Sequence, residues 1–356
     1  MKKLLTLMLA LAMLVGVALP AVAQSNTGDA YVFWYTYGDV YLSSVREALN
    51  NAFDAAGIKY VDNDANGNQN DQMAQIDTAI TANAALLAVN VVETGSEGTA
   101  QGIVDKAKEA NLPLVFYNRS VDEKIVTSYD RAVYVGTDYE EAGQMQGDLI
   151  GDYLIENYEA LDLNGDGVIS YVMFKGDEAN QEAISRTKFG VENANAKLVE
   201  AGKPELVFYD ENNGDKYLVD QNGQWSNGAA FEYMSTILAQ YNEENNNMIE
   251  LVIANNDDMA LGAINALTNI GFNNGEEGAK VIPVFGVDAT DTAKDLIASG
   301  RMVGTIKQDA EGMADAIATV SKNLMEGKDK FENLNEGYVI EGTWRVNIPY
   351  APYTGE

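Results

Sequence analysis

Short apolar runs rich in β-branched and aromatic residues alternate along the chain with longer segments whose apolar residues recur at helical spacing. The short runs predict strands and the longer segments predict helices. The predicted strands are Tyr31–Tyr37, Ile58–Asp62, Leu86–Val91, Leu114–Asn118, Val133–Gly136, Ile169–Phe174, Glu205–Tyr209, Leu251–Ala254, Val281–Val287 and Met302–Ile306. The predicted helices include Ser43–Ala56, Gly98–Ala110, Tyr139–Tyr158, Glu182–Ala201, Ala229–Tyr241, Asp258–Ile270, Thr290–Ser299 and Ala310–Gly327. Such alternation is typical of mostly parallel sheets with helices on both faces.

The number of strands and the length of the chain both indicate two domains. A chain of 356 residues exceeds the roughly 250–300 residues at which one hydrophobic core stops growing. We therefore expect two Rossmann-like α/β lobes, each a mostly parallel sheet flanked by helices. The first should comprise residues 29–137 plus 309–344, and the second residues 138–308 plus 345–356, with crossings near Thr137 and Gln308. Lobes joined by several short crossings can move as a hinge.

The amino-terminal residues have the pattern of a secretory signal peptide. Two lysines precede the apolar stretch Leu4–Leu19, and Ala21-Val-Ala23 offers a small-residue cleavage site. A membrane anchor is the alternative, but the stretch is shorter than the roughly 20 residues that span a bilayer, and it ends at Pro20. We expect cleavage after Ala23, export to the periplasm and no membrane insertion of the mature chain.

Charge and residue usage exclude several functions. With 54 acidic and 23 basic residues the formal net charge is −31, which disfavours nucleic acid and anionic membranes as partners. The chain has no histidine, so it has neither a Ser-His-Asp triad nor an imidazole metal ligand. It has no cysteine for disulfides or thiolate chemistry. We expect a protein that is not an enzyme; the alternative is an exported glycoside hydrolase with paired carboxylates, such as Asp39 with Glu182 or Asp288.

Polar residues stand at the carboxyl ends of the predicted strands in both halves of the chain. They are Tyr37-Gly-Asp39, Asn90, Asn118-Arg119, Lys175-Gly-Asp177, Asn255-Asn-Asp257, Asp288 and Gln308. Ligands bind at this edge of α/β sheets, although each residue could instead be a helix N-cap, above all Asp257 and Asp288. Carboxylates, amides and an arginine can bond neighbouring hydroxyls through two atoms, whereas a phosphate would call for basic residues. The set predicts a small, uncharged, polar ligand such as a monosaccharide.

The segment Asp162-Leu-Asn-Gly-Asp-Gly-Val-Ile-Ser170 matches the first nine positions of a calcium-binding loop. Oxygen-bearing side chains stand at positions 1, 3, 5 and 9, and glycine at position 6. Position 12 is Met173 instead of glutamate, and a strand follows, so the last carboxylate would have to come from elsewhere in the fold. The alternative is a simple turn between a helix and a strand.

Several longer segments match one known family. They are Tyr35-Thr-Tyr-Gly-Asp-Val-Tyr-Leu-Ser-Ser-Val-Arg46, Asn70-Asp-Gln72, Val115-Phe-Tyr-Asn118, Ser128-Tyr-Asp130, Tyr134-Val-Gly-Thr-Asp138, Gln146-Gly-Asp-Leu-Ile150, Asp162–Gly167, Val252-Ile-Ala-Asn-Asn-Asp257, Pro283-Val-Phe-Gly-Val-Asp288 and Gly304-Thr305. From about Tyr31 to Tyr350 the chain resembles the periplasmic galactose/glucose-binding proteins, which feed ABC importers. The resemblance implies a type I periplasmic binding protein with a multi-crossing hinge. It also implies a monomer that closes around a monosaccharide and delivers it to an ABC transporter permease, with a chemoreceptor as an alternative partner.

The resemblance also implies the binding residues. The ligand set is Asp39, Tyr41, Asn118, Asn180, Glu182, Arg186, Trp225, Asn256, Asp288 and Gln308, with Tyr41 and Trp225 against the two faces of a pyranose. A structural Ca²⁺ would be held by Asp162, Asn164, Asp166, the carbonyl of Val168, Ser170 and the distant Glu250. Asn180, Glu182 and Gln308 replace the family's His, Asp and Asn, and Ser170 replaces a longer amide. The identity of the sugar therefore stays open.

Overall fold

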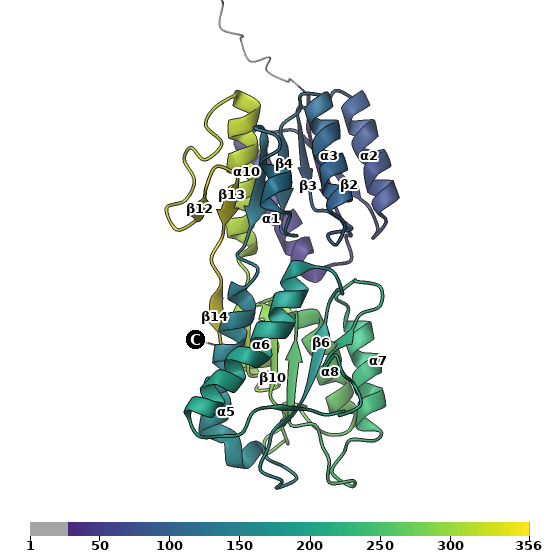
Figure 1. The fold of residues 1–356 in the computed structure, drawn as a ribbon, viewed down its shortest axis with the longest axis vertical. Coiled ribbons are helices and arrows are strands. Elements are labelled where there is room, and N and C mark those ends of the chain that lie inside the picture. The colour runs from purple at the N-terminus through teal and green to yellow at the C-terminus, as the bar shows by residue number, and fades with distance from the viewer. Residues whose placement is uncertain (1–27, 356) are drawn as a thin grey trace, which may run out of the picture.

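Two seven-stranded sheets, each at the centre of its own α/β lobe, organise the chain in a computed structural model that describes residues 28–355. The lobes lie one above the other along the longest axis (Figure 1). The predicted fold class is thereby confirmed. The predicted signal peptide, residues 1–23, lies outside the described residues. Among the residues described, none of the helices is both long and apolar enough to cross a bilayer.

The first sheet has the strand order β12-β13-β5-β4-β3-β1-β2. Its strands are β1 (Ala30–Trp34), β2 (Tyr60–Asp64), β3 (Leu86–Val89), β4 (Leu114–Tyr117), β5 (Ala132–Gly136), β12 (Val339–Glu341) and β13 (Arg345–Asn347). Its helices are α1 (Val40–Ala56), α2 (Gln69–Thr81), α3 (Glu97–Glu109), α4 (Glu123–Val126) and α10 (Ala310–Glu326). Apolar side chains of α1 and α10 pack on one face of the sheet, and those of α2 and α3 on the other. All neighbouring strands are parallel except β12 and β13.

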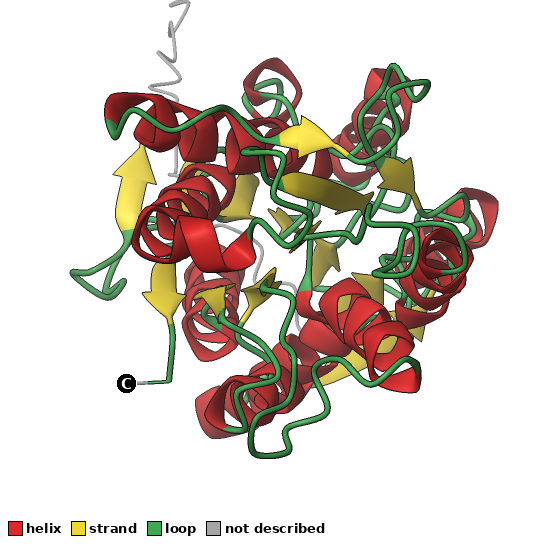
Figure 2. Cartoon of the chain, turned by 90° about the horizontal axis from the view of Figure 1, so that it is seen from below, coloured by secondary structure: helices red, strands yellow, loops and turns green. Residues whose placement is uncertain are grey.

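The second sheet has the order β14-β11-β10-β9-β6-β7, with β8 also paired to β6. Its strands are β6 (Ser170–Lys175), β7 (Val207–Phe208), β8 (Leu218–Val219), β9 (Leu251–Ala254), β10 (Val284–Asp288), β11 (Gly304–Lys307) and β14 (Ala351–Tyr353). Its helices are α5 (Glu141–Leu161), α6 (Gln181–Glu200), α7 (Asn227–Leu238), α8 (Asp257–Asn269) and α9 (Asp291–Ala298). Because side chains alternate along a strand, Leu251 and Ile253 pack against α5 and α6, and Val252 and Ala254 against α7 and α8. Figure 2 shows the helices around the strands.

The chain crosses between the lobes three times, and the third crossing differs from the prediction. The first two crossings lie between β5 and α5 and between β11 and α10. Residues 345–356 were assigned to the second lobe, but β13 pairs in parallel with β5 of the first sheet, with Val346 beside Val135. Only the residues after Asn347 reach the second lobe, where β14 pairs antiparallel to β11. A three-residue strand is too short to show a periodic pattern, so its pairing was not visible in the sequence.

Candidate functional site

All ten residues of the predicted ligand set line one narrow cavity between the lobes, together with Tyr35 and Arg119. The ligand-binding role of these residues stays a prediction, but the structure brings every one of them to the same place. The free volume between the side chains is about 40 Å³, which is room for a few water molecules. A hexose can therefore enter only if the lobes separate or the side chains move.

The carboxyl ends of the parallel strands face this cavity, and helix caps place some of its side chains. Asp39, Asn180 and Asn256 cap α1, α6 and α8, each accepting a hydrogen bond of 2.8 to 3.0 Å from the backbone N–H three residues further on. Each of these three residues therefore both caps a helix and lines the cavity. Asp257 and Asp288 were considered as possible caps, but Asn256 and Thr290 occupy the cap positions of α8 and α9.

Three cavity residues have backbone conformations that L-amino acids disfavour. Asn118, Trp225 and Asp288 have φ angles of 61°, 56° and 126°. Conformations of this kind cost about 1–3 kcal/mol each and cluster at binding sites, where the surrounding fold imposes them. Here the strain accompanies side chains that end at the cavity wall.

Two aromatic rings, Tyr41 and Trp225, contribute to the cavity wall from different lobes and are 6% and 8% exposed. Gly176, just after β6, allows the indole to lie against the backbone, because a Cβ atom there would be 2.0 Å from the Trp225 ring. Aromatic faces can contact the C–H groups of a sugar ring.

Tyr35 and Arg119 were not among the predicted ligand residues. The Arg119 guanidinium lies 3.8 Å from the centre of the Tyr35 ring, and the Tyr35 hydroxyl donates to Asp39 at 2.7 Å. Arg119 was itself among the polar residues at the carboxyl ends of the predicted strands, although the ligand set omitted it, and Tyr35 opens the segment that contains Asp39. For Tyr35, its place in that segment is the signal that could have found it.

Arg186 is the cationic side chain of the second lobe in the cavity wall, and it is 4% exposed. It donates to the carbonyl of Asn255 at 2.9 Å, and at 3.0 Å to both the Gln308 side chain and the Tyr350 hydroxyl. Desolvation raises the pKa of Asp288 well above its usual value, Arg186 opposes this shift, and the charges of Asp257 and Asp39 add to it. The site thus combines a fixed cation with a carboxyl group that takes up a proton more readily than usual.

Four buried polar atoms of the cavity residues have no hydrogen-bond partner among the residues described. They are Tyr41 Oη, Glu182 Oε2, Arg186 Nε and Gln308 Nε2. An unpaired buried polar atom costs about 1–3 kcal/mol. The set contains two donors, one acceptor and one hydroxyl that can act as either. A ligand that carries several hydroxyl groups could pair all four.

Outside the cavity, the loop of residues 162–170 lies beside Glu250. The Asp162 carboxylate accepts hydrogen bonds of 2.8 to 3.1 Å from the backbone N–H groups of residues 165, 166 and 167, so the loop turns around it. Glu250 accepts from the N–H of Leu163 at 2.7 Å through Oε1 and from that of Ser170 at 2.8 Å through Oε2. The distant carboxylate therefore contacts the loop at both ends.

The donor set of this loop suits a hard cation in chemistry, since carboxylate, amide, hydroxyl and carbonyl oxygens are the ligands that Ca²⁺ prefers. In residues 28–355, no three Asp, Glu, His or Cys side chains are placed closely enough to hold a metal ion by themselves. A cation at this loop would thus also need the oxygens of Asn164, Val168 and Ser170. Calcium binding stays a prediction.

Two α/β lobes with three crossings and a polar cavity between them define a two-lobed ligand-binding protein. Residues 30–329 match the family model described as periplasmic binding protein domain. The chain belongs to this family.

Two relatives share most of their length with this chain. The D-galactose/methyl-galactoside binding periplasmic protein MglB of Haemophilus influenzae is 36% identical over 319 residues, which cover 89% of this chain and 86% of that protein. The xylitol-binding protein of Mycolicibacterium smegmatis is 26% identical, with coverage of 92% and 80%. The alternative of a glycoside hydrolase has no support from these relatives.

Solved structures show the same fold. An ABC transporter solute binding protein from Bacillus halodurans with bound myo-inositol has a TM-score of 0.68 at 23% identity, with coverage of 94% of this chain and 96% of that one. One from Clostridium phytofermentans with bound β-D-glucose has a TM-score of 0.68 at 20% identity, with coverage of 90% and 93%.

Proposed function

We propose that this chain is an exported binding protein that captures a galactose- or glucose-like monosaccharide in the cavity between its lobes and delivers it to an ABC importer. Family membership and the 36% identity to a galactose-binding periplasmic protein support this function. Because the cavity is narrow and its wall comes from both lobes, the ligand enters the open protein and is enclosed when the hinge closes.

The observation that carries the proposal is that four unpaired polar atoms and two aromatic side chains belong to residues that line the same cavity. Hydroxyl groups of one sugar can accept from Arg186 and Gln308, donate to Glu182 and pair with Tyr41. The ring faces of the sugar would contact Tyr41 and Trp225. A phosphorylated sugar fits poorly, because Asp39, Glu182 and Asp288 surround the same space.

The partners and the location follow from the same function. We propose cleavage after Ala23, a monomeric periplasmic protein and docking of the ligand-bound form on a transporter permease, with a chemoreceptor as a second partner. We also propose that Ca²⁺ at loop 162–170 is structural. Family membership supports the periplasm, and the oxygen donors of the loop support the cation.

Titration of the purified protein with a panel of monosaccharides tests the proposal. Tryptophan emission and calorimetry should both respond to an aldohexose, and glucose 6-phosphate should give no response. Trp34 and Trp344 do not line the cavity, so Trp225→Phe should abolish the change in emission while the heat of binding remains. A folded protein that gives no heat with any aldohexose contradicts the proposed function.

A further inference from the structure

Ser120 and Glu182 join the two lobes beside the cavity. Ser120 lies in the loop between β4 and α4 of the first lobe, and Glu182 lies in the first turn of α6 in the second lobe. Glu182 Oε1 accepts a hydrogen bond of 3.0 Å from the Ser120 backbone N–H and one of 2.6 Å from its hydroxyl. Hydrogen bonds to a carboxylate are about twice as strong as those between neutral groups.

The two oxygens of Glu182 have different surroundings. Oε1 is bonded to the first lobe, whereas Oε2 is buried without a partner, and the side chain as a whole lines the cavity. Ser120 itself does not line the cavity. One carboxylate can therefore hold the opposite lobe with one oxygen and accept from a ligand with the other.

The loop that carries Ser120 is held in place from its own lobe. The Tyr134 hydroxyl donates to the carbonyl of Asn118 at 2.7 Å and lies 3.3 Å from the Ser120 hydroxyl. The neighbouring contact between lobes, from Arg119 to Asp177, is longer at 3.4 Å, and Asp177 is 19% exposed. Of these two contacts, the one between Ser120 and Glu182 is thus expected to contribute more.

We infer that Ser120 is a positioning residue that determines how long the ligand is retained, although it does not touch the ligand. Its bonds to Glu182 exist only while the lobes are together, so opening must break them. Stabilising the closed arrangement slows dissociation more than it changes association, since differences in affinity within one site lie mostly in the dissociation rate. The identity of the ligand in this inference rests on the proposed function, whereas the contact between the lobes is independent of it.

Stopped-flow kinetics with D-glucose and D-galactose test the inference. Ser120→Ala should raise the dissociation rate about tenfold, as expected for loss of one hydrogen bond to a charged group, and change the association rate less. Ser120→Thr, which keeps the hydroxyl, should restore slow dissociation. Ser128→Ala is the matched control, because its hydroxyl makes a 2.6 Å bond to the Ile125 carbonyl within one lobe. It should leave the dissociation rate unchanged.

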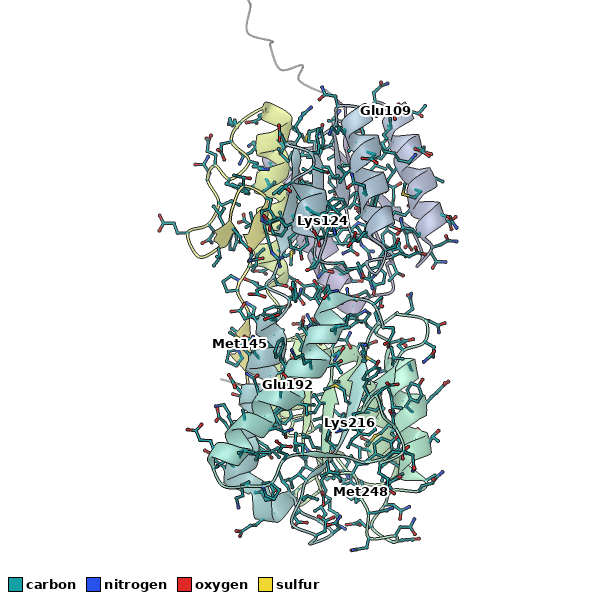
Figure 3. All side chains as sticks on the ribbon, in the orientation of Figure 1. Glu109, Lys124, Met145, Glu192, Lys216 and Met248 are labelled. Atoms are coloured by element: carbon teal, nitrogen blue, oxygen red, sulfur yellow. The ribbon has the colours of Figure 1, made fainter. Side chains whose placement is uncertain are left out.

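A distance measurement without ligand separates this inference from the proposed function. The chain has no cysteine, so Glu109→Cys and Glu192→Cys place spin labels at two unique exposed helical sites, one on each lobe (Figure 3). Ser120→Ala should shift the distances between the labels toward the open form, and Ser128→Ala should not. If no hexose binds but the distances shift, the proposed function fails and the lobe contact stands. Unchanged distances and an unchanged dissociation rate in Ser120→Ala overturn the inference.

Discussion

Arg186 donates a 3.0 Å hydrogen bond from Nη2 to Oε1 of Gln308, which joins α6 to the crossing between β11 and α10. The same nitrogen donates to the Tyr350 hydroxyl at 3.0 Å, beside the third crossing. One guanidinium thus connects the cavity wall to two of the three connections between the lobes, and its Nε remains free for a ligand.

Replacing this arginine should weaken ligand binding strongly. Lysine in Arg186→Lys keeps the charge but loses the planar set of donors, so it cannot serve Asn255, Gln308 and a ligand together. We expect affinity for the bound sugar to fall about 10–100-fold by calorimetry. Arg301→Lys is the control, since Arg301 bonds the Asn273 carbonyl at 2.7 Å away from the cavity. Equal affinities of the two variants would contradict the assigned role of Arg186.

Gly176→Ala should reduce binding by displacing Trp225. The added Cβ would meet the indole at 2.0 Å, and the ring must move from its place in the cavity wall. A displaced ring should cost at least about 1.4 kcal/mol of binding free energy, so affinity should fall about tenfold or more. Tryptophan emission of the free protein should also change. A Cβ at Gly214 of the same lobe meets nothing within 4 Å, so Gly214→Ala should behave as the parent protein. Binding that survives in Gly176→Ala would show that the indole position is unimportant.

Most of the fold could be predicted because its central strands, β3, β4, β5, β9 and β10, are fully buried. The alternation of apolar runs and amphipathic segments follows directly from parallel sheets with helices on both faces. α2 was missing from the predicted helices because its buried face carries Gln69 and Gln72. Gln72 is fully buried and donates to the Asn90 carbonyl at 2.8 Å. Polar residues that form hydrogen bonds with neighbouring backbone groups can occupy the buried face of a helix. The spacing of apolar residues does not reveal such a helix.

Part of the candidate site was visible because parallel strands bring their carboxyl ends to one edge. Asp39 and Asn256, far apart in sequence, line the same cavity for this reason. Only the family resemblance implied the other ligand residues, which are Tyr41, Asn180, Glu182, Arg186 and Trp225. What the sequence did not indicate are contacts between lobes, such as that of Ser120 with Glu182. Such contacts depend on how the two lobes sit relative to one another, and no local pattern encodes that placement.

The stability of the protein should depend on pH through Asp257. Desolvation raises the pKa of this carboxyl to about 7, although bonds from Thr305 and Thr290 oppose the shift. A raised pKa in the folded state means that folding favours the protonated form, so stability is highest below pH 4 for this group alone and declines as the pH rises toward 7. The free energy of unfolding should lose up to about 1.4 kcal/mol per pH unit in this range from Asp257.

Denaturant unfolding between pH 4 and 8 measures this dependence. Asp257→Asn, which resembles the protonated form, should be more stable than the parent at pH 8 and show a flatter profile. Asp291→Asn removes an equal charge from a side chain that is 99% exposed and should keep the parent's slope. Identical slopes for the two variants would mean that other groups, such as Asp288 with its raised pKa, and not Asp257, set the pH dependence.

Calcium should raise the thermal stability of the protein, because a cation that binds only the folded loop shifts the unfolding equilibrium. At one hundred times the dissociation constant the gain is about 2.7 kcal/mol, and for a chain of this length we expect a rise of several degrees in melting temperature. Asp166→Ala should remove the response, since its carboxylate is one of the proposed ligands. Asp210→Ala removes a similar surface aspartate, which accepts from the N–H of Asn212 at 3.0 Å, and should keep the response. If the parent protein has the same melting temperature in calcium and in chelator, residues 162–170 form only a turn. The hydrogen bonds to the Asp162 carboxylate would then hold that turn without a cation.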